Sequence, residues 1–151
     1  MQDLDETIVV VTGGRNFANK LFLNETLDMY FPEDERPVAL IHGDCTGADA
    51  LAKEWAIEHG VPQIPVGAPW DAFSAAVDSL AQRHGVQLTP EFIEAFKKLA
   101  GPLRNEMLKR MLVGSNVKRK VVVGFPGGRG TADCMRRARS AADKIAVIEV
   151  K

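Results

Sequence analysis

Three glycine-rich segments, each directly after a run of aliphatic residues, carry the residue types best suited to hold an anion. They are Gly13-Gly14-Arg15, Gly43-Asp44-Cys45-Thr46-Gly47 and Pro126-Gly127-Gly128-Arg129-Gly130-Thr131. Glycine lets the backbone approach a phosphate closely, and a helix that starts there presents unpaired N–H groups at the positive end of its dipole. One such corner is more often a plain turn. Three together favour a shared phosphate site.

Arginine side chains supply the positive charge that a phosphate site needs. Arg15 and Arg129 belong to the corners, and Arg104 lies in the first turn of a predicted helix. A guanidinium binds phosphate through two parallel hydrogen bonds, whereas a cation in a first helical turn opposes the dipole. We therefore expect Arg104 to contact the anion. The alternatives are an ion pair with Glu106 or an acid of 71–100, a solvated loop tip for Arg129, and a clamp on a neighbouring loop for Arg15.

Polar side chains near the corners are candidates for hydrogen bonds to ribose hydroxyls. Asp44 and Asp49 lie in and after the second corner, Asn105 follows Arg104, and Asp133 follows the third corner. Carboxylates accept such bonds. Stabilisation of a helix dipole explains Asp49 and Asp133 equally well, because both lie in predicted first turns.

The remaining reactive side chains give no sign of a metal or a cofactor. His42, His59 and His84 have no ligand spacing with one another or with the cysteines. None of the corners has the Gly-Lys-Ser/Thr of a Walker loop or the dinucleotide fingerprint. Cys45 at a helix start could have a lowered thiol pKa, but no histidine partner is specified, so we expect a small buried residue.

The elements that would position these residues alternate along the chain. Strands are predicted at 7–12, 38–41, 63–66, 121–123 and 145–148, and helices at 19–30, 48–59, 101–112 and 131–142. The helix at 101–112 is expected to bury Leu103, Met107, Leu108, Met111 and Leu112. This alternation predicts a doubly wound α/β domain with a parallel sheet, in which the three corners meet at one edge near the topological switch point.

The 151 residues suffice for one domain spanning 1–151. Segment 71–100 carries two further amphipathic stripes and is interpreted as a two-helix insertion, too short to hold a core alone. Trp70 beside it is either a stacking surface for a base or part of the packing of this insertion.

Composition excludes several classes of partner. The net charge is −1, with 46% hydrophobic and 26% charged residues, so no bulk charge draws the protein to nucleic acid or membranes. Two cysteines make no disulfide framework, and no apolar run approaches 18 residues. We expect a cytoplasmic protein without membrane or direct nucleic-acid contacts.

Several of these motifs resemble the SLOG superfamily, and most closely its YspA/YpsA-like branch, which is related to the LOG phosphoribohydrolases often labelled lysine decarboxylases. The resemblance rests on Val11-Thr12-Gly13-Gly14-Arg15, His42-Gly43, Thr46-Gly47-Ala48-Asp49-Ala50-Leu51-Ala52, Trp70, Gly101-Pro102-Leu103-Arg104-Asn105, Met107 and the segment from Pro126 to Ala132. It implies a Rossmann-like domain that binds a nucleotide or nucleotide-derived ligand at the glycine loops, commonly as a homodimer or higher homo-oligomer.

One position departs from the enzymatic LOG members. They carry a glutamate three positions after the Gly-Thr, where this chain has Cys134, and Asp133 is the nearest acid; Arg104 matches their arginine. Without a placed carboxylate, the loop would bind without cutting. The first hypothesis is therefore binding, for sensing or sequestration. The alternatives are hydrolysis of a nucleoside 5′-monophosphate with Arg104 and Asp133 as catalytic residues, and a regulatory module whose insertion recruits a partner.

Overall fold

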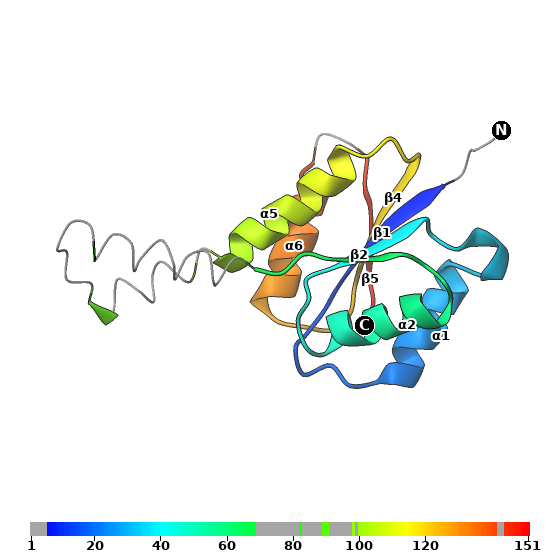
Figure 1. The fold of residues 1–151 in the computed structure, drawn as a ribbon, viewed down its shortest axis with the longest axis horizontal. Coiled ribbons are helices and arrows are strands. Elements are labelled where there is room, and N and C mark those ends of the chain that lie inside the picture. Colours follow the sequence, from blue (N-terminus) through cyan, green and yellow to red (C-terminus); the bar gives the residue numbers. More distant parts are fainter. Residues whose placement is uncertain (1–5, 69–81, 83–88, 91–97, 99, 142–143) are drawn as a thin grey trace.

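A computed structural model describes residues 6–68, 82, 89–90, 98, 100–141 and 144–151. Within them, five parallel strands form one sheet in the order β3-β2-β1-β4-β5 (Figure 1). The strands are β1 Thr7–Thr12, β2 Ala39–His42, β3 Gln63–Pro65, β4 Arg119–Gly124 and β5 Ala146–Glu149. Trp70 and almost all of the predicted insertion at 71–100 lie outside the described residues.

The centre of the sheet is β1, whose β-branched residues are covered on both sides. Val9 pairs with Leu40 of β2 and with Val121 of β4. Successive side chains alternate between the two faces, so Val9 enters one core cluster and Val10 the other. Continuous valine runs are typical of such doubly covered parallel strands.

Two pairs of helices cover the sheet, one pair on each face (Figure 1). On one face, α1 (Lys20–Tyr30) and α2 (Ala48–Glu58) pack through Leu23, Leu27 and Trp55. On the other, α5 (Ala100–Val113) and α6 (Arg129–Arg139) pack through Leu108, Leu112 and Met135. A short 3-10 helix, η1 (Glu33–Glu35), interrupts the loop before β2. The predicted Rossmann-like α/β class is confirmed.

The inward side of α5 differs from the prediction. Leu103 and Met107 were expected to be buried, but they are 46% and 49% exposed. Leu108 and Leu112 are buried as predicted, and the other buried positions are Ala100 and Asn105. The helix is turned in this way because the side chain of Asn105 meets α6, as described below, and so Leu103 and Met107 face away from the core.

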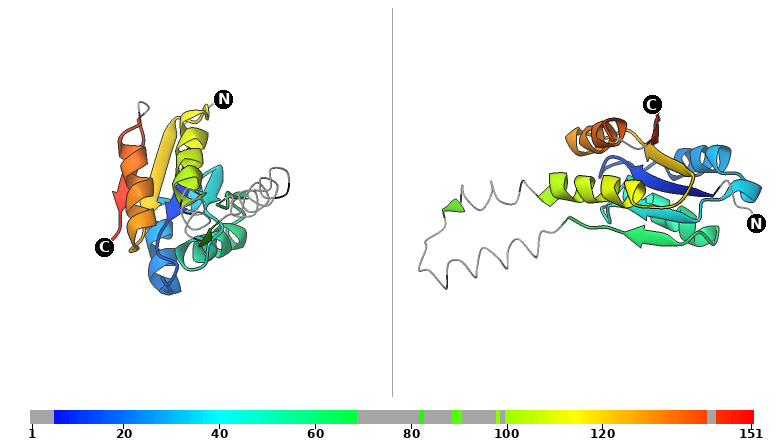
Figure 2. Two further views of the ribbon diagram at one scale, coloured as in Figure 1. Left: turned by 90° about the vertical axis from the view of Figure 1, so that its left-hand side faces the viewer. Right: turned by 90° about the horizontal axis from the view of Figure 1, so that it is seen from above.

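The strand order fixes where a ligand would bind. From β1 the chain moves outward to β2 and β3, then returns to place β4 on the other side of β1. The sheet therefore has its topological switch point between β1 and β4, at their carboxyl ends. β1 runs toward the end of the molecule where α5 begins (Figure 2, right). Among the described helices, none has the length and apolarity to cross a membrane.

Candidate functional site

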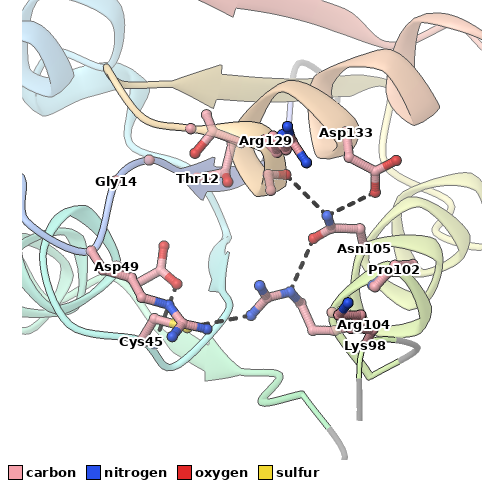
Figure 3. A pocket seen from close by; sticks show the side chains of 16 residues that line it. Thr12, Gly14, Cys45, Asp49, Lys98, Pro102, Arg104, Asn105, Arg129 and Asp133 are labelled. Atoms are coloured by element: carbon pink, nitrogen blue, oxygen red, sulfur yellow. Dashed lines mark hydrogen bonds between the residues drawn. The ribbon is translucent and has the colours of Figure 1, made fainter. Parts of the chain in front are cut away.

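A cavity of about 560 Å³ lies at this switch point (Figure 3). Three of its walls come from the loops after β1, β2 and β4, and the fourth from the first turn of α5. Its lining residues are Thr12, Gly13, Gly14, Arg15, Cys45, Asp49, Lys98, Gly101, Pro102, Arg104, Asn105, Gly128, Arg129, Gly130, Thr131 and Asp133.

The three glycine corners are bonded to one another through their backbones. The amide of Gly14 donates to the carbonyl of Pro126 at 2.9 Å, and the carbonyl of Gly14 accepts from the amide of Ala48 at 3.1 Å. The hydroxyl of Thr46 donates to the carbonyl of Arg15 at 3.2 Å. The corners therefore form one structural unit, with the loop after β1 in the middle.

The glycines divide into those that let the corners pack and those that face open space. Gly47 has a φ of +78°, and a Cβ atom there would overlap the carbonyl oxygen of Gly14. A Cβ atom at Gly127 would lie 2.6 Å from the Gly14 nitrogen. By contrast, nothing lies within 4 Å of a Cβ atom at Gly128 or Gly130. Their backbone is accessible from the cavity.

The third corner leads into α6, whose start lies at the cavity. No side chain caps this helix at Gly128, and its first turn closes through the amide of Ala132, which donates to the Gly128 carbonyl at 3.1 Å. The amides of Arg129, Gly130 and Thr131 precede the Ala132 amide, which is the first intrahelical donor, and they carry the positive end of the helix dipole. An anion at this point would find three amide donors.

Arg104 reaches across the cavity from α5 to the second corner (Figure 3). Its Nη1 donates to the Gly43 carbonyl at 2.9 Å and lies 3.6 Å from the Cys45 sulfur. A Cβ atom at position 43 would overlap the guanidinium, so any other residue there would displace Arg104 from this position. The ion pair with Glu106 does not form, because Glu106 binds Lys109 and Arg110 of α5 and Arg137 of α6.

Asn105 is the most thoroughly engaged polar side chain of the site. It is 3% exposed. Its amide oxygen accepts from Nε of Arg104 at 3.0 Å, and its amide nitrogen donates to the Gly130 carbonyl and to Asp133 Oδ2, each at 3.0 Å. Asn105 thereby ties the guanidinium of Arg104 to the first turn of α6.

Asp49 and Asp133 differ in their electrostatic surroundings. Burial raises the pKa of Asp49 above its usual range, and the charge of Arg104 partly opposes that rise. Burial also acts to raise the pKa of Asp133, but hydrogen bonds from Asn105, Arg137 and Arg136 outweigh it, and the pKa is lowered. Arg137 Nε lies 2.8 Å from Oδ2 of Asp133, while Arg136 binds the other oxygen. Asp133 is therefore held in its ionised form, and its negative charge is balanced by Arg136 and Arg137.

Cys134 lies in the core between α6 and the sheet and does not line the cavity. It is 3% exposed, and burial raises its pKa to about 11. A thiol with this pKa stays protonated at neutral pH and is a poor nucleophile. Cys45 is half-buried and lines the cavity, contrary to the expectation of a buried residue.

Three further cations line the cavity. They are Arg15, Lys98 and Arg129. None of the three makes an ion pair or a side-chain hydrogen bond with another described residue. With Arg104, they give the cavity an excess of positive charge over its two acids.

The comparison with known families agrees with these motifs. Residues 7–73 match the family described as YspA, cpYpsA-related SLOG. This part of the chain, which includes the first two glycine corners, is therefore similar to the SLOG family. No match was found among the curated proteins or among the solved structures.

Most of the residues predicted to bind the ligand line the cavity, and the others belong to the loops that surround it. Those in the lining are Gly13, Gly14, Arg15, Asp49, Arg104, Asn105, Gly128, Arg129, Gly130, Thr131 and Asp133. Those outside it are Gly43, Asp44, Gly47, Pro126 and Gly127. The predicted ligand-binding set did not include five lining residues: Thr12, Cys45, Lys98, Gly101 and Pro102. Cys45 belongs to the second corner, and Thr12, Gly101 and Pro102 belong to the quoted motifs, whereas Lys98 belongs to no motif that could have pointed to it.

The structural role of His42 was not predicted from the sequence. Asp44 has a φ of +56° and points to solvent, while its amide donates to Nδ1 of His42 at 3.0 Å. The other ring nitrogen of His42 bonds to Gln63 at 2.7 Å. This buried histidine thus shapes the second corner of the site. The described residues contain no cluster of His, Cys, Asp and Glu suited to a metal ion.

Proposed function

We propose that this protein binds a nucleotide or nucleotide-derived ligand in the cavity, for sensing or sequestration, and does not cleave it. The observation that carries this proposal is the start of α6, open to the cavity beside cations that have no ion-pair partner among the described residues. Backbone amides at a helix start together with arginine forks are a common phosphate-binding arrangement.

The phosphate end of the ligand would lie against Gly128, Gly130 and Thr131. Arg129 and Arg15 line the same cavity and would neutralise the phosphate together with Arg104. Asp133 does not cancel this positive charge, because Arg136 and Arg137 already neutralise it from outside the cavity. The family match over residues 7–73 supports a nucleotide-related ligand at the loops after β1 and β2, which line the same cavity.

The ribose end would lie toward Asp49 rather than Asn105. All three hydrogen bonds of Asn105 are made within the protein. Asp49 lines the cavity and accepts one bond, from the amide of Cys45 at 3.3 Å. A carboxylate with remaining acceptor capacity suits a pair of ribose hydroxyls.

Two features favour binding over hydrolysis of the N-glycosidic bond. The position of the LOG glutamate holds Cys134, which is buried. The neighbouring acid, Asp133, has a lowered pKa and bonds to two arginines, so it is poorly suited to donate a proton or activate water.

Thermal shift against nucleoside 5′-monophosphates, cyclic dinucleotides and ADP-ribose tests the binding proposal. A ligand at a hundredfold excess over Kd should stabilise the protein by about 3 kcal/mol. Arg15→Ala should weaken binding about tenfold or more, because a charge-assisted hydrogen bond is lost. Arg119 is exposed at the start of β4, at the opposite end of the strands from the cavity. Arg119→Ala should therefore leave the thermal shift unchanged. If no compound raises the melting temperature, the proposal fails.

Assay of free base distinguishes binding from hydrolysis. We expect no base release from any monophosphate that binds. Release that disappears in Asp133→Ala would establish the LOG-like activity instead.

A further inference from the structure

The charged side chains are divided between the two halves of the fold. Among the described residues, 6–68 carry ten acidic and four basic side chains, whereas 100–141 and 144–151 carry three acidic and twelve basic ones. The net charge of −1 conceals this division. Because α1 and α2 belong to the first half and α5 and α6 to the second, the two helix layers on opposite faces of the sheet have opposite charge.

The outer surface of α1 and α2 combines acids with exposed apolar side chains. We call it the acidic face, and its residues are Leu21, Glu25, Met29, Glu54, Ile57 and Glu58. Leu21, Met29 and Ile57 are each more than 60% exposed. Lys20 lies 3.5 Å from both Glu54 and Glu58 and cancels part of their charge. Glu25 makes no ion pair with a described residue.

The outer surface of α5 and α6 has the opposite character. We call it the basic face, and its residues are Leu103, Met107, Arg110, Val113, Arg136 and Arg139. The side chains of Arg110 and Arg136 are 77% and 68% exposed. Their partners are shared, since Glu106 also binds Lys109 and Arg137, and Asp133 also binds Arg137. Arg139 pairs with Glu149 at 3.1 Å, so these five cations face three acids. Positive charge therefore remains in excess.

We propose that the protein associates head to tail with further copies of itself, the acidic face of one copy lying on the basic face of the next. Each face offers exposed apolar side chains surrounded by charges that the other complements, whereas two like faces would repel. Because the faces lie on opposite sides of the sheet, a contact between two copies leaves one face of each copy free for a further copy. Repetition of one heterologous contact produces an open stack rather than a symmetric dimer.

Salt dependence is the first test of this contact. Sedimentation velocity of the full chain at about 20 mM salt should show species that grow with protein concentration, and at about 500 mM salt they should dissociate, because exposed charges are then screened within a few ångströms. A monomer at every concentration in low salt would overturn the proposal. So would a dimer that persists unchanged at high salt.

Variants that remove charges from only one face test whether each face is needed for self-association. Arg110→Gln/Arg139→Gln removes two charges from the basic face without touching a residue that lines the cavity. Glu25→Gln/Glu54→Gln does the same for the acidic face. Each double variant should be monomeric in low salt, while Lys118→Gln/Arg119→Gln, which removes two charges from the strand-start edge, should assemble like the unmodified protein. Far-UV circular dichroism and the melting temperature show whether each variant is folded.

Mixing the two face variants distinguishes head-to-tail association from a symmetric dimer. One variant keeps the acidic face and the other the basic face, so an equimolar mixture should form a 1:1 complex that stops at two chains. Absence of that complex, with both variants folded, would contradict the proposal. A basic face that instead binds a single-stranded oligonucleotide, while the protein alone stays monomeric in low salt, would show that its partner is a polyanion.

Discussion

Among single residues, Asn105 is the side chain on which the shape of the cavity most depends. Its replacement by alanine leaves Nε of Arg104 and the carbonyl of Gly130 without their partner. We predict that Asn105→Ala lowers the free energy of unfolding by about 2 kcal/mol and also weakens nucleotide binding, because the guanidinium is no longer held. Urea unfolding and thermal shift measure the two effects. Asn116→Ala, an exposed control, should change neither.

The two cysteines offer a second test at the same scale. Cys45 lines the cavity, whereas Cys134 is buried with a pKa of about 11. In the folded protein at neutral pH, iodoacetamide should modify Cys45 and leave Cys134 intact, with Cys134 reacting only after unfolding. Peptide mass spectrometry reads both sites. Rapid modification of Cys134 in the folded protein would show that the thiol is accessible, and would remove one argument against catalysis at this position.

Among the structural elements, the contact between the first two glycine corners is the most constrained. Gly47 and Gly60 have nearly equal positive φ, +78° and +69°, but a Cβ atom at Gly47 would strike the neighbouring loop while one at Gly60 would meet nothing. Gly60→Ala should cost about 1 kcal/mol, the penalty for the left-handed backbone. Gly47→Ala should cost clearly more and abolish nucleotide binding. Equal losses in urea unfolding would mean that the loops do not pack as described.

The ion pairs that Glu106 makes between α5 and α6 predict that the free energy of unfolding depends on pH. Hydrogen bonds from Lys109, Arg110 and Arg137 lower the pKa of Glu106 from 4.5 to about 2. A lowered pKa means that the stabilisation is present above pH 4.5 and is lost as the pH falls toward 2. Glu106→Gln should therefore reduce the loss of stability between these pH values, as measured by urea unfolding. An unchanged pH profile would show that these exposed ion pairs contribute nothing.

For the whole molecule, the sequence predicted the architecture better than the details of the site. Continuous β-branched runs such as the one in β1 leave little choice but a buried parallel strand, and they fix the edge at which the corners meet. Helix orientation was harder to predict. Leu103 and Met107 are apolar at helical spacing, yet Asn105 faces inward because its hydrogen-bond partners lie on α6, a contact that periodicity does not encode.

The site shows the same limit. The corners and arginines could be found from residue type, because phosphate binding needs glycine and guanidinium. The sequence could not predict which polar residues bind other parts of the protein and which are left to bind a ligand. Asn105 and Asp133 have the right chemistry for a ligand, but their partners come from residues distant in sequence, and only the folded chain shows that these bonds are already made.

Native mass spectrometry of the protein incubated with the nucleotide panel tests the central claim most directly, because it reports binding and cleavage together. The account predicts an adduct with the mass of one intact nucleotide, which weakens in Arg15→Ala and persists in Arg119→Ala. Absence of any adduct, or the appearance of free base and ribose 5-phosphate in place of the intact nucleotide, would contradict it.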